Sequence, residues 1–292
     1  MKARLVKSIL HLTAHLPLPM VHLMGALVGL GLLLLPNKTR TIAATNITLC
    51  FPELDARGRK RLLRQNLIET AKTFAETGIF WLGRPARFQK LIKEVVGEKH
   101  LEAALAQGKG AIIIAPHIGN WEIVGLYCSG RYPMTSMYRP PRLAELDVLI
   151  RAARQRYGAT LVPTNAQGVK GLLQALKRNE LIGILPDQDP KESGGHFAPF
   201  FGVQANTMVL LSRLAQKSQA PTLLVYAERL AWGRGFRLHF VPGPTAINDR
   251  DMERSVAAVN ALVEQAARAI PAQYLWSYKR FKTRPPGEPE IY

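Results

Sequence analysis

Short apolar runs alternate with helix-like segments over the last two thirds of the chain, and this alternation limits the fold more than any other feature. Six runs have the length and apolar character of buried strands: residues 111–115, 134–138, 159–163, 181–186, 222–230 and 236–242. Helical patterns lie between most of them, and a long amphipathic one covers residues 251–270. Strands that alternate with helices usually pair in parallel. The sequence therefore predicts an α/β fold with a mostly parallel central sheet flanked by helices.

The residues that follow each apolar run are candidates for chemistry, because sites in such sheets gather at the carboxyl ends of the strands. After residues 111–115 comes Pro-His-Ile-Gly-Asn-Trp-Glu, which places His117 at a strand end and an acid, Glu122, five residues later. If Asn120 caps the next helix, Glu122 lies in its first turn and stays ionised. There it can accept a hydrogen bond from one imidazole nitrogen and leave the other to take a proton. This arrangement is typical of general-base activation of a hydroxyl.

A structural interpretation of the same stretch stays open at this point. A lone histidine in a turn is common, and the spacing to Glu122 alone would favour that view; the surrounding Pro-His-x-Gly-Asn-Trp-Glu pattern favours catalysis. Other catalytic patterns are missing from the sequence, which has no G-x-S-x-G, Walker A or H-E-x-x-H motif. The histidines are scattered and the two cysteines, Cys50 and Cys128, stand alone, so we expect no metal site and reduced thiols.

Two further groups follow other runs. Tyr138-Arg139-Pro140 leads into a basic helix that carries Arg151 and Arg154, and a guanidinium suits a phosphate, although a solvated basic face is the simpler explanation for most of these residues. Asp187-Gln188-Asp189 follows residues 181–186, where the acids could orient an arginine, contact substrate hydroxyls or cap the following loop.

That loop is rich in glycine and aromatic residues. Phe197, Phe200 and Phe201 suit an acyl chain, but packing in the core is the commoner role of such residues.

The N-terminal segment favours a membrane anchor. Residues 9–35 contain no charged side chain, and basic residues flank them on both sides. We predict an anchor over residues 1–36 and a catalytic domain over residues 37–292. Pro17 and Pro19 leave only residues 20–35 uninterrupted, and at about 1.5 Å per residue they reach roughly 24 Å, less than a hydrocarbon core of about 30 Å. A kinked span and a helix within one leaflet both remain open, while a cleaved signal peptide and a buried core helix are disfavoured.

The charge balance indicates an anionic partner. The chain has 39 Lys and Arg against 21 Asp and Glu, a net charge of +18. Ten basic residues against two acidic ones lie in residues 1–64, beside the anchor, and nine against three lie in residues 131–180. The first group suits an anionic membrane surface and biases the main domain to the cytoplasm. Nucleic acid is the least supported partner, because no zinc-finger spacing, RNA-recognition signature or isolated basic arm is present.

Several blocks, in this order, resemble the late lauroyl/myristoyl acyltransferases of lipid A biosynthesis, within the wider glycerolipid acyltransferases marked by His-x4-Asp/Glu. Besides the N-terminal anchor, the blocks are residues 46–53, 117–122, 138–140, 185–189, 199–202 and 276–284. The resemblance implies an acyltransferase α/β sandwich in the bacterial inner membrane, with the catalytic domain facing the cytoplasm. It implies an acyl carrier protein as the acyl donor, the hydroxyl of a 3-hydroxyacyl chain on a phosphorylated glycolipid as the acceptor, and no cofactor.

Carried over by position, the resemblance makes His117 the general base and Glu122 its partner. The remaining substrate-binding candidates are Asn120, Arg139, Arg154, Asp187 and Asp189. Backbone N–H groups at residues 120–122 are candidates for holding the oxyanion. Two alternatives remain: a related acyltransferase that acts on a lysophospholipid or a mannosylated phosphoinositide, and, from another class, a membrane-tethered nucleic-acid-binding protein.

Overall fold

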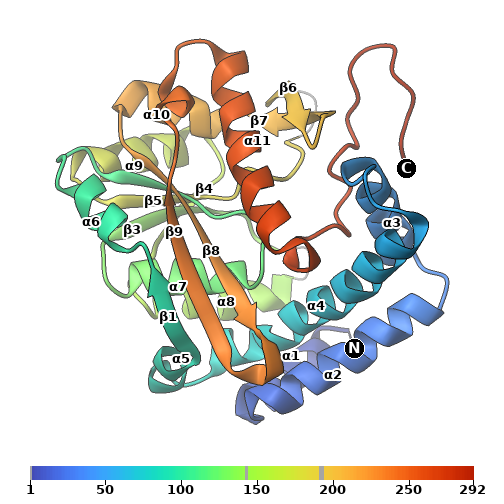
Figure 1. Ribbon diagram of the computed structural model, residues 1–292. Helices are drawn as coiled ribbons and strands as arrows, with labels where there is room; N and C mark the ends of the chain where they lie inside the picture. Colours follow the sequence, from blue (N-terminus) through green and yellow to red (C-terminus); the bar gives the residue numbers. More distant parts are fainter. Residues whose placement is uncertain (1, 142–143, 191–193) are drawn as a thin grey trace.

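The computed structural model describes residues 2–141, 144–190 and 194–292, and its centre is a seven-stranded sheet (Figure 1). The strand order is β1-β9-β8-β2-β5-β3-β4, and among these pairs only β8 and β9 run antiparallel. The strands are β1 (Ile92–Val96), β2 (Ala111–Ile114), β3 (Met134–Tyr138), β4 (Thr160–Pro163), β5 (Leu181–Ile184), β8 (Thr222–Leu230) and β9 (Gly235–Pro242). The predicted α/β fold with a mostly parallel sheet is confirmed.

Helices cover both faces of this sheet (Figure 1). They are α1 (Lys2–His15), α2 (Leu18–Leu34), α3 (Lys38–Cys50), α4 (Ala56–Leu82), α5 (Pro85–Leu91), α6 (Lys99–Leu105), α7 (Trp121–Ser129), α8 (Asp147–Gln155), α9 (Ala166–Lys177), α10 (Leu210–Ser218) and α11 (Met252–Ala269). A separate antiparallel hairpin, β6 (Gly195–Phe200) and β7 (Val203–Met208), lies beside α11. All six predicted strands are present, whereas β1, β6 and β7 were not predicted because polar residues, glycine or proline interrupt their apolar residues.

The middle of the sheet is dry. Every residue of β2 and β5 is buried, so helices on both faces exclude water from these two strands. Full burial of an isoleucine or leucine side chain contributes about 1.5–3 kcal/mol, which makes this pair of strands a rigid base for the residues that follow it.

Phe200 and Phe201 join the core, whereas Phe197 is half-buried; none of the three lines the cavity beside His117. Phe200 and Phe201 are buried, and Phe201 packs against Phe51 and Trp276 at centroid distances of 5.1 and 5.4 Å. The commoner role of such residues, core packing, therefore applies to Phe200 and Phe201.

The N-terminal helices lie against the rest of the protein. α2 packs along α4 so closely that a methyl group at Gly25 or Gly29 would come within 2.6 Å of a backbone Cα of α4. In the described part of the chain no helix is both long and apolar enough to cross a bilayer alone; only α2 and α3 together pass that test, and they are bent by 81°. The single anchor helix that we expected is therefore not confirmed, and the division at residues 36 and 37 stays a prediction.

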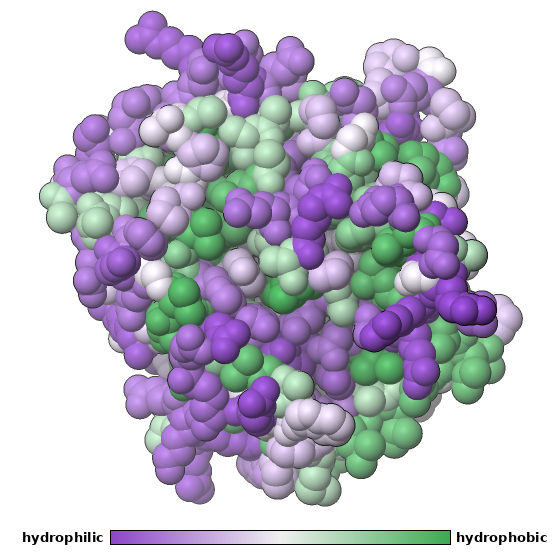
Figure 2. Space-filling model, viewed as in Figure 1, coloured by the Kyte–Doolittle hydropathy of each residue, from purple (hydrophilic) through white to green (hydrophobic). Residues whose placement is uncertain are grey.

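The outward face of α1 and α2 is apolar, and Figure 2 shows hydrophobic side chains gathered at the lower right, where Figure 1 places α2. We call this set the N-terminal apolar face; it comprises Leu5, Ile9, Leu12, Met20, Leu23, Leu27, Val28, Leu34 and Leu35. Next to it lies the turn between β8 and β9, where Gly233 contacts Pro19 and the side chain of Trp232 is 91% exposed. Contiguous exposed apolar surface of this kind marks an interaction site.

Candidate active site

His117 and Asp187 meet because their strands are neighbours. β2 pairs in parallel with β5, and the register sets Ile114 opposite Ile184. His117 and Asp187 each follow three residues later, so they leave the sheet at the same level. The carboxylate of Asp187 accepts two hydrogen bonds from His117, one from the backbone N–H and one from imidazole Nδ1, each 2.8 Å long.

Asp187 is held in its charged form. Burial alone would raise its pKa, but the electrostatic attraction of His117 and the two hydrogen bonds that His117 donates outweigh burial and lower the pKa below its ordinary value. Tyr274 is a hydrogen-bond partner of Asp187, and burial together with the charge of Asp187 raises the pKa of its hydroxyl, which therefore stays a neutral donor. Asp187 is only 4% exposed, so its carboxylate has no competing partner in bulk water.

These contacts fix the tautomer of the imidazole. With Nδ1 donating to Asp187, Nε2 carries the lone pair, and it lies 3.1 Å from the side-chain amide nitrogen of Gln188, which can donate to it. The ring of Trp121 packs against the imidazole at a centroid distance of 4.8 Å and limits its rotation. Nε2 is thus presented as a proton acceptor next to the cavity described below.

Glu122 does not contact His117, which corrects the predicted hydrogen bond between them. Its carboxylate accepts from Arg154 Nη2 at 2.6 Å and from Arg154 Nε at 3.2 Å, and also from the indole N–H of Trp81 at 3.2 Å. The side chains of Glu122 and Arg154 are 12% and 33% exposed. Burial alone would lower the pKa of Arg154, but Glu122 raises it above its ordinary value. α7 and α8 are therefore joined by a bidentate ion pair in the cavity wall.

Asn120 also differs from the prediction. It is the first residue before α7, but its side chain makes no capping hydrogen bond and does not line the cavity. Its amide instead donates to Oε2 of Glu76, a fully buried residue of α4, at 2.8 Å. Thr73, one turn earlier in α4, donates to the backbone carbonyl of Gly119 at 3.0 Å. These two hydrogen bonds from α4 fix the position of the loop between β2 and α7, which carries His117.

Glu76 belongs to a buried cluster of charges, which the sequence analysis did not find. It accepts from Nε and Nη2 of Arg229 at 2.5 and 2.6 Å and lies 2.5 Å from Nε2 of His22 on α2. Burial raises the pKa of Glu76, but Arg229 and the hydrogen bonds more than offset it and lower the pKa to about 2. We call Glu76, Arg229, His22, Glu69 and Thr73 the buried charge cluster. This cluster joins α2, α4 and β8 next to the loop that carries His117.

The two remaining predicted residues lie at the edge of the site. Arg139 is exposed at the rim of the cavity. Asp189 also lines the cavity, but its carboxylate accepts from the backbone N–H of Thr283 at 2.9 Å and from the amide of Asn206 at 3.4 Å. The structure therefore brings together His117 with Asp187 and Glu122 with Arg154, while Asp189 ties the loop to the C-terminal segment.

A cavity of about 460 Å³ opens next to His117. Most of its wall is apolar, and three flexible methionines contribute: Met134 and Met137 from β3, and Met208 at the end of β7. Its polar lining is confined to a few side chains, among them His117, the Glu122–Arg154 pair, Ser136 and Gln188. This volume lies in the range of small-molecule sites, and an apolar wall with a few convergent polar groups is typical of them. The volume and lining suit a hydrocarbon chain whose polar end lies at His117.

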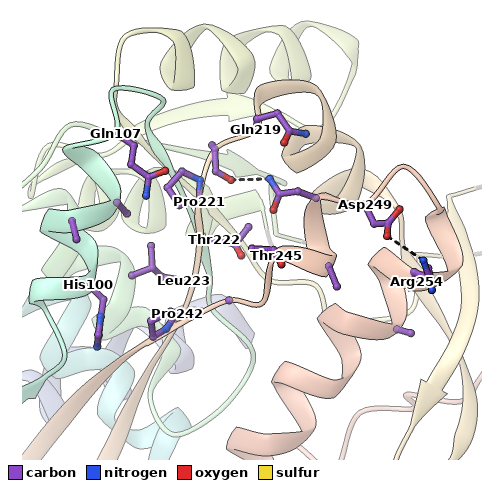
Figure 3. A pocket seen from close by; sticks show the side chains of 17 residues that line it. His100, Gln107, Gln219, Pro221, Thr222, Leu223, Pro242, Thr245, Asp249 and Arg254 are labelled. Carbon is purple, nitrogen blue, oxygen red and sulfur yellow. Dashed lines mark hydrogen bonds and ion pairs between the residues drawn. The ribbon is translucent and has the colours of Figure 1, made fainter.

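A second cavity, of about 1090 Å³, lies at the opposite edge of the sheet, where β8 begins (Figure 3). His100, Gln107, Thr222 and Asp249 are among the residues that line it, and Asp249 pairs with Arg254 at 3.8 Å. It lies away from the carboxyl ends of the parallel strands, where sites of α/β sheets gather. Among the described residues of its wall, His100 is the single histidine and no acid pairs with it, so this cavity is the weaker candidate despite its size.

Neither thiol is suited to nucleophilic chemistry. Cys50 and Cys128 are both free and buried, and burial raises the pKa of Cys128 to about 12 and that of Cys50 further. Among the residues that the structure describes, no three His, Cys, Asp or Glu side chains lie together in a way that could hold a metal ion.

The chain is similar to known proteins over nearly its whole length. The chain matches the family model of the bacterial lipid A biosynthesis acyltransferases over residues 3–283. It is 31% identical over 289 residues to the lipid A biosynthesis palmitoleoyltransferase of Escherichia coli K12, covering 98% of this chain and 92% of that protein. Against the lauroyltransferase of the same strain the identity is 29% over 286 residues with the same coverage, and against its myristoyltransferase 24% over 261 residues, covering 88% and 80%.

Proposed function

Since the chain belongs to the bacterial lipid A biosynthesis acyltransferase family, we propose that it moves a fatty acyl chain from acyl carrier protein to the hydroxyl of a 3-hydroxyacyl chain on a phosphorylated lipid A precursor. The observation that carries this proposal is the His117–Asp187 pair beside an apolar cavity. A base with a fixed lone pair activates a hydroxyl, and the cavity offers room for the acyl chain.

The proton follows a short path in this mechanism. The acceptor hydroxyl displaces the amide of Gln188 from Nε2 of His117. Nε2 then removes the hydroxyl proton while the hydroxyl oxygen attacks the thioester carbonyl carbon. The new ester C–O bond forms, the C–S bond breaks, and the imidazolium gives the proton to the leaving thiolate. Asp187 stabilises the imidazolium through Nδ1. A positioned base of this kind contributes about 10²–10⁴-fold in rate.

The developing oxyanion needs donors near the same carbon. The N–H groups of Gly119 and Asn120 are bonded to the carbonyls of Gln273 and Ala227, so they are not available. At the start of α7, the N–H groups of Trp121 and Glu122 have no partner within the helix, because the first turn of a helix lacks the preceding carbonyls. We assign the oxyanion to these two groups.

Arg154 is the candidate for binding the substrate's phosphate or carbonyl oxygens. Its pairing with Glu122 uses Nε and Nη2, so Nη1 takes no part in it. In this proposal Glu122 orients Arg154, and it does not orient His117. Arg139, at the rim, adds a second positive charge for the phosphorylated acceptor or for the acidic carrier protein.

The N-terminal apolar face supplies contact with the membrane. α2 buries one side against α4 and exposes the other, which fits a helix that lies along the interface of the inner membrane with the catalytic cavity on the cytoplasmic side. The basic residues of the first 64 positions would add attraction to anionic headgroups. The acceptor, itself a membrane lipid, could then reach His117 without leaving the bilayer surface.

The test is mass spectrometry of lipid A from a strain that lacks the protein. We expect the loss of one acyl unit, restored by the wild-type protein and by His100→Ala, which alters the second cavity, but not by His117→Ala. Unchanged lipid A in the deletion strain would overturn the proposal, and an accumulated lysophospholipid would support the alternative acceptor.

A further inference from the structure

Gly125 stands in the middle of α7 without a local reason to be glycine. Its φ is not positive, and among the residues that the structure describes no atom beyond its own helix would lie within 4 Å of a methyl group there. Glycine in a helix interior costs about 1 kcal/mol relative to alanine. Other glycines of the fold are needed for close packing; at Gly183, for example, a methyl group would lie 2.4 Å from Cε of Met134. The backbone of α7 does not require Gly125.

The open space at Gly125 is the cavity itself, which Gly125 lines together with Glu122, three residues earlier, and Trp121, four residues earlier. Residues three and four apart share a helix face, so a side chain at position 125 would point in the same direction as Trp121 and Glu122. A side chain here would project into the cavity.

The direction of the strands shows how deep this point lies. β3 runs from Met134 to Tyr138, parallel to β5, and Arg139 at the rim follows it. Both Met134 and Arg139 line the cavity, so its depth along β3 is on the order of 17 Å for five steps of about 3.3 Å. α7 starts beside His117 and returns toward the opposite edge; four residues at about 1.5 Å place Gly125 about 6 Å below Trp121. Gly125 therefore lies part way down, with Met134 deeper.

We infer that Gly125 determines the length of the acyl chain that the enzyme accepts. The inference rests on the proposed function and adds a specificity-determining residue to it. The missing side chain leaves the passage to the Met134 end open for the terminal methylenes of a long chain. A larger side chain closes that passage, so the cavity then holds only the part of the chain between His117 and position 125.

The experiment measures kcat/KM of the purified full-length protein with a series of saturated acyl carrier protein donors that differ by two carbons. We compare the wild type, Gly125→Ala, Gly125→Leu and Gly31→Leu. Gly31 is the matched control: it lies inside helix α2, a methyl group there also has no neighbour within 4 Å, and it does not line the cavity. Both leucine variants gain the same helix propensity.

In Gly125→Leu we expect the preferred donor to become shorter by about two to four carbons, since the four side-chain carbons of leucine take the room of as many chain carbons. Activity with the wild type's best donor should fall at least about tenfold. Gly125→Ala should shift the profile in the same direction by less, which keeps the inference testable if the leucine variant folds poorly. Gly31→Leu should leave the profile unchanged.

An unchanged length profile in Gly125→Ala and Gly125→Leu, or an equal loss with every donor, would overturn the inference while leaving the proposed function intact. If the wild type transfers from none of these donors, the proposed function itself fails. The two failures are therefore distinguishable.

Discussion

Replacing Glu76 by glutamine should destabilise the protein strongly, because Glu76 is the centre of the buried charge cluster. The carboxylate is fully buried and partners Arg229 twice, His22 once and Asn120 once. In Glu76→Gln the guanidinium of Arg229 keeps only Glu69 and Thr73 as side-chain partners among the described residues. A buried charge that loses its main counter-charge costs about 3–5 kcal/mol.

The pKa of Glu76 gives an independent estimate of the loss of folding free energy. A value of about 2 in the fold, against 4.5 for the ordinary group, corresponds to about 3 kcal/mol in favour of the charged form. Because the folded pKa lies below the unfolded one, this stabilisation is present above about pH 4.5 and is lost as the pH falls toward 2. Glu76→Gln should therefore flatten the acid side of the stability profile as well as lower it.

The assay is thermal unfolding followed by circular dichroism, at neutral pH and across the acid range. A loss of 3–5 kcal/mol lowers the melting temperature by roughly 6–12 °C for a chain of this size. The control is Glu94→Gln, because Glu94 is 50% exposed in its ion pair with Arg237 and such pairs contribute at most about 1 kcal/mol. If both variants melt within about 2 °C of each other, the reasoning is refuted. At temperatures where Glu76→Gln is folded, its kcat should still fall, by up to about 10²-fold, because Asn120 loses its anchor.

Three further predictions concern the site and the membrane. Asp187→Asn should lower kcat by about 10³–10⁴-fold without unfolding, since an amide favours the wrong tautomer of His117; steady-state kinetics that match the wild type would contradict this role. Arg154→Lys should lower kcat/KM about 10–100-fold because lysine cannot form the bidentate pair, whereas Arg151→Lys, at an exposed residue of α8 that lies over the ring of Tyr138 and does not line the cavity, should change it little. Trp232→Ser should weaken sedimentation with anionic vesicles about tenfold at an unchanged melting temperature, and equal binding would exclude Trp232 from the contact.

Most of the fold could be predicted from local patterns. The runs that became β2, β5 and β8 are apolar because both faces of the sheet are covered at these strands, and each run shows this in its own composition. The hairpin of β6 and β7 could not be predicted in the same way, because its hydrogen bonds come from residues far along the chain: the hydroxyl of Thr207 bonds Asn260 and Arg280, and Arg280 also donates to the backbone carbonyl of Asn206.

The N-terminal helices show the limit of composition as evidence. The uncharged run of residues 9–35 indicates a lipid-facing segment, and its outward side is indeed apolar. Composition does not reveal that Gly25 and Gly29 let α2 approach α4, or that His22 pairs with Glu76. A helix that meets lipid on one side and protein on the other has nearly the composition of one that meets lipid all round.

For the candidate site, too, the sequence and the tertiary structure determine different features. By itself the sequence determined which side chains leave the sheet at strand ends, since His117, Glu122 and Asp187 each follow an apolar run at a distance that can be counted along the chain. Only the tertiary structure decided which of them touch. The pairing of β2 with β5 brings His117 into contact with Asp187, and the packing of α8 near α7 brings Arg154 into contact with Glu122. Strand order and helix docking depend on contacts between residues distant in sequence, and spacing along the chain carries no information about them.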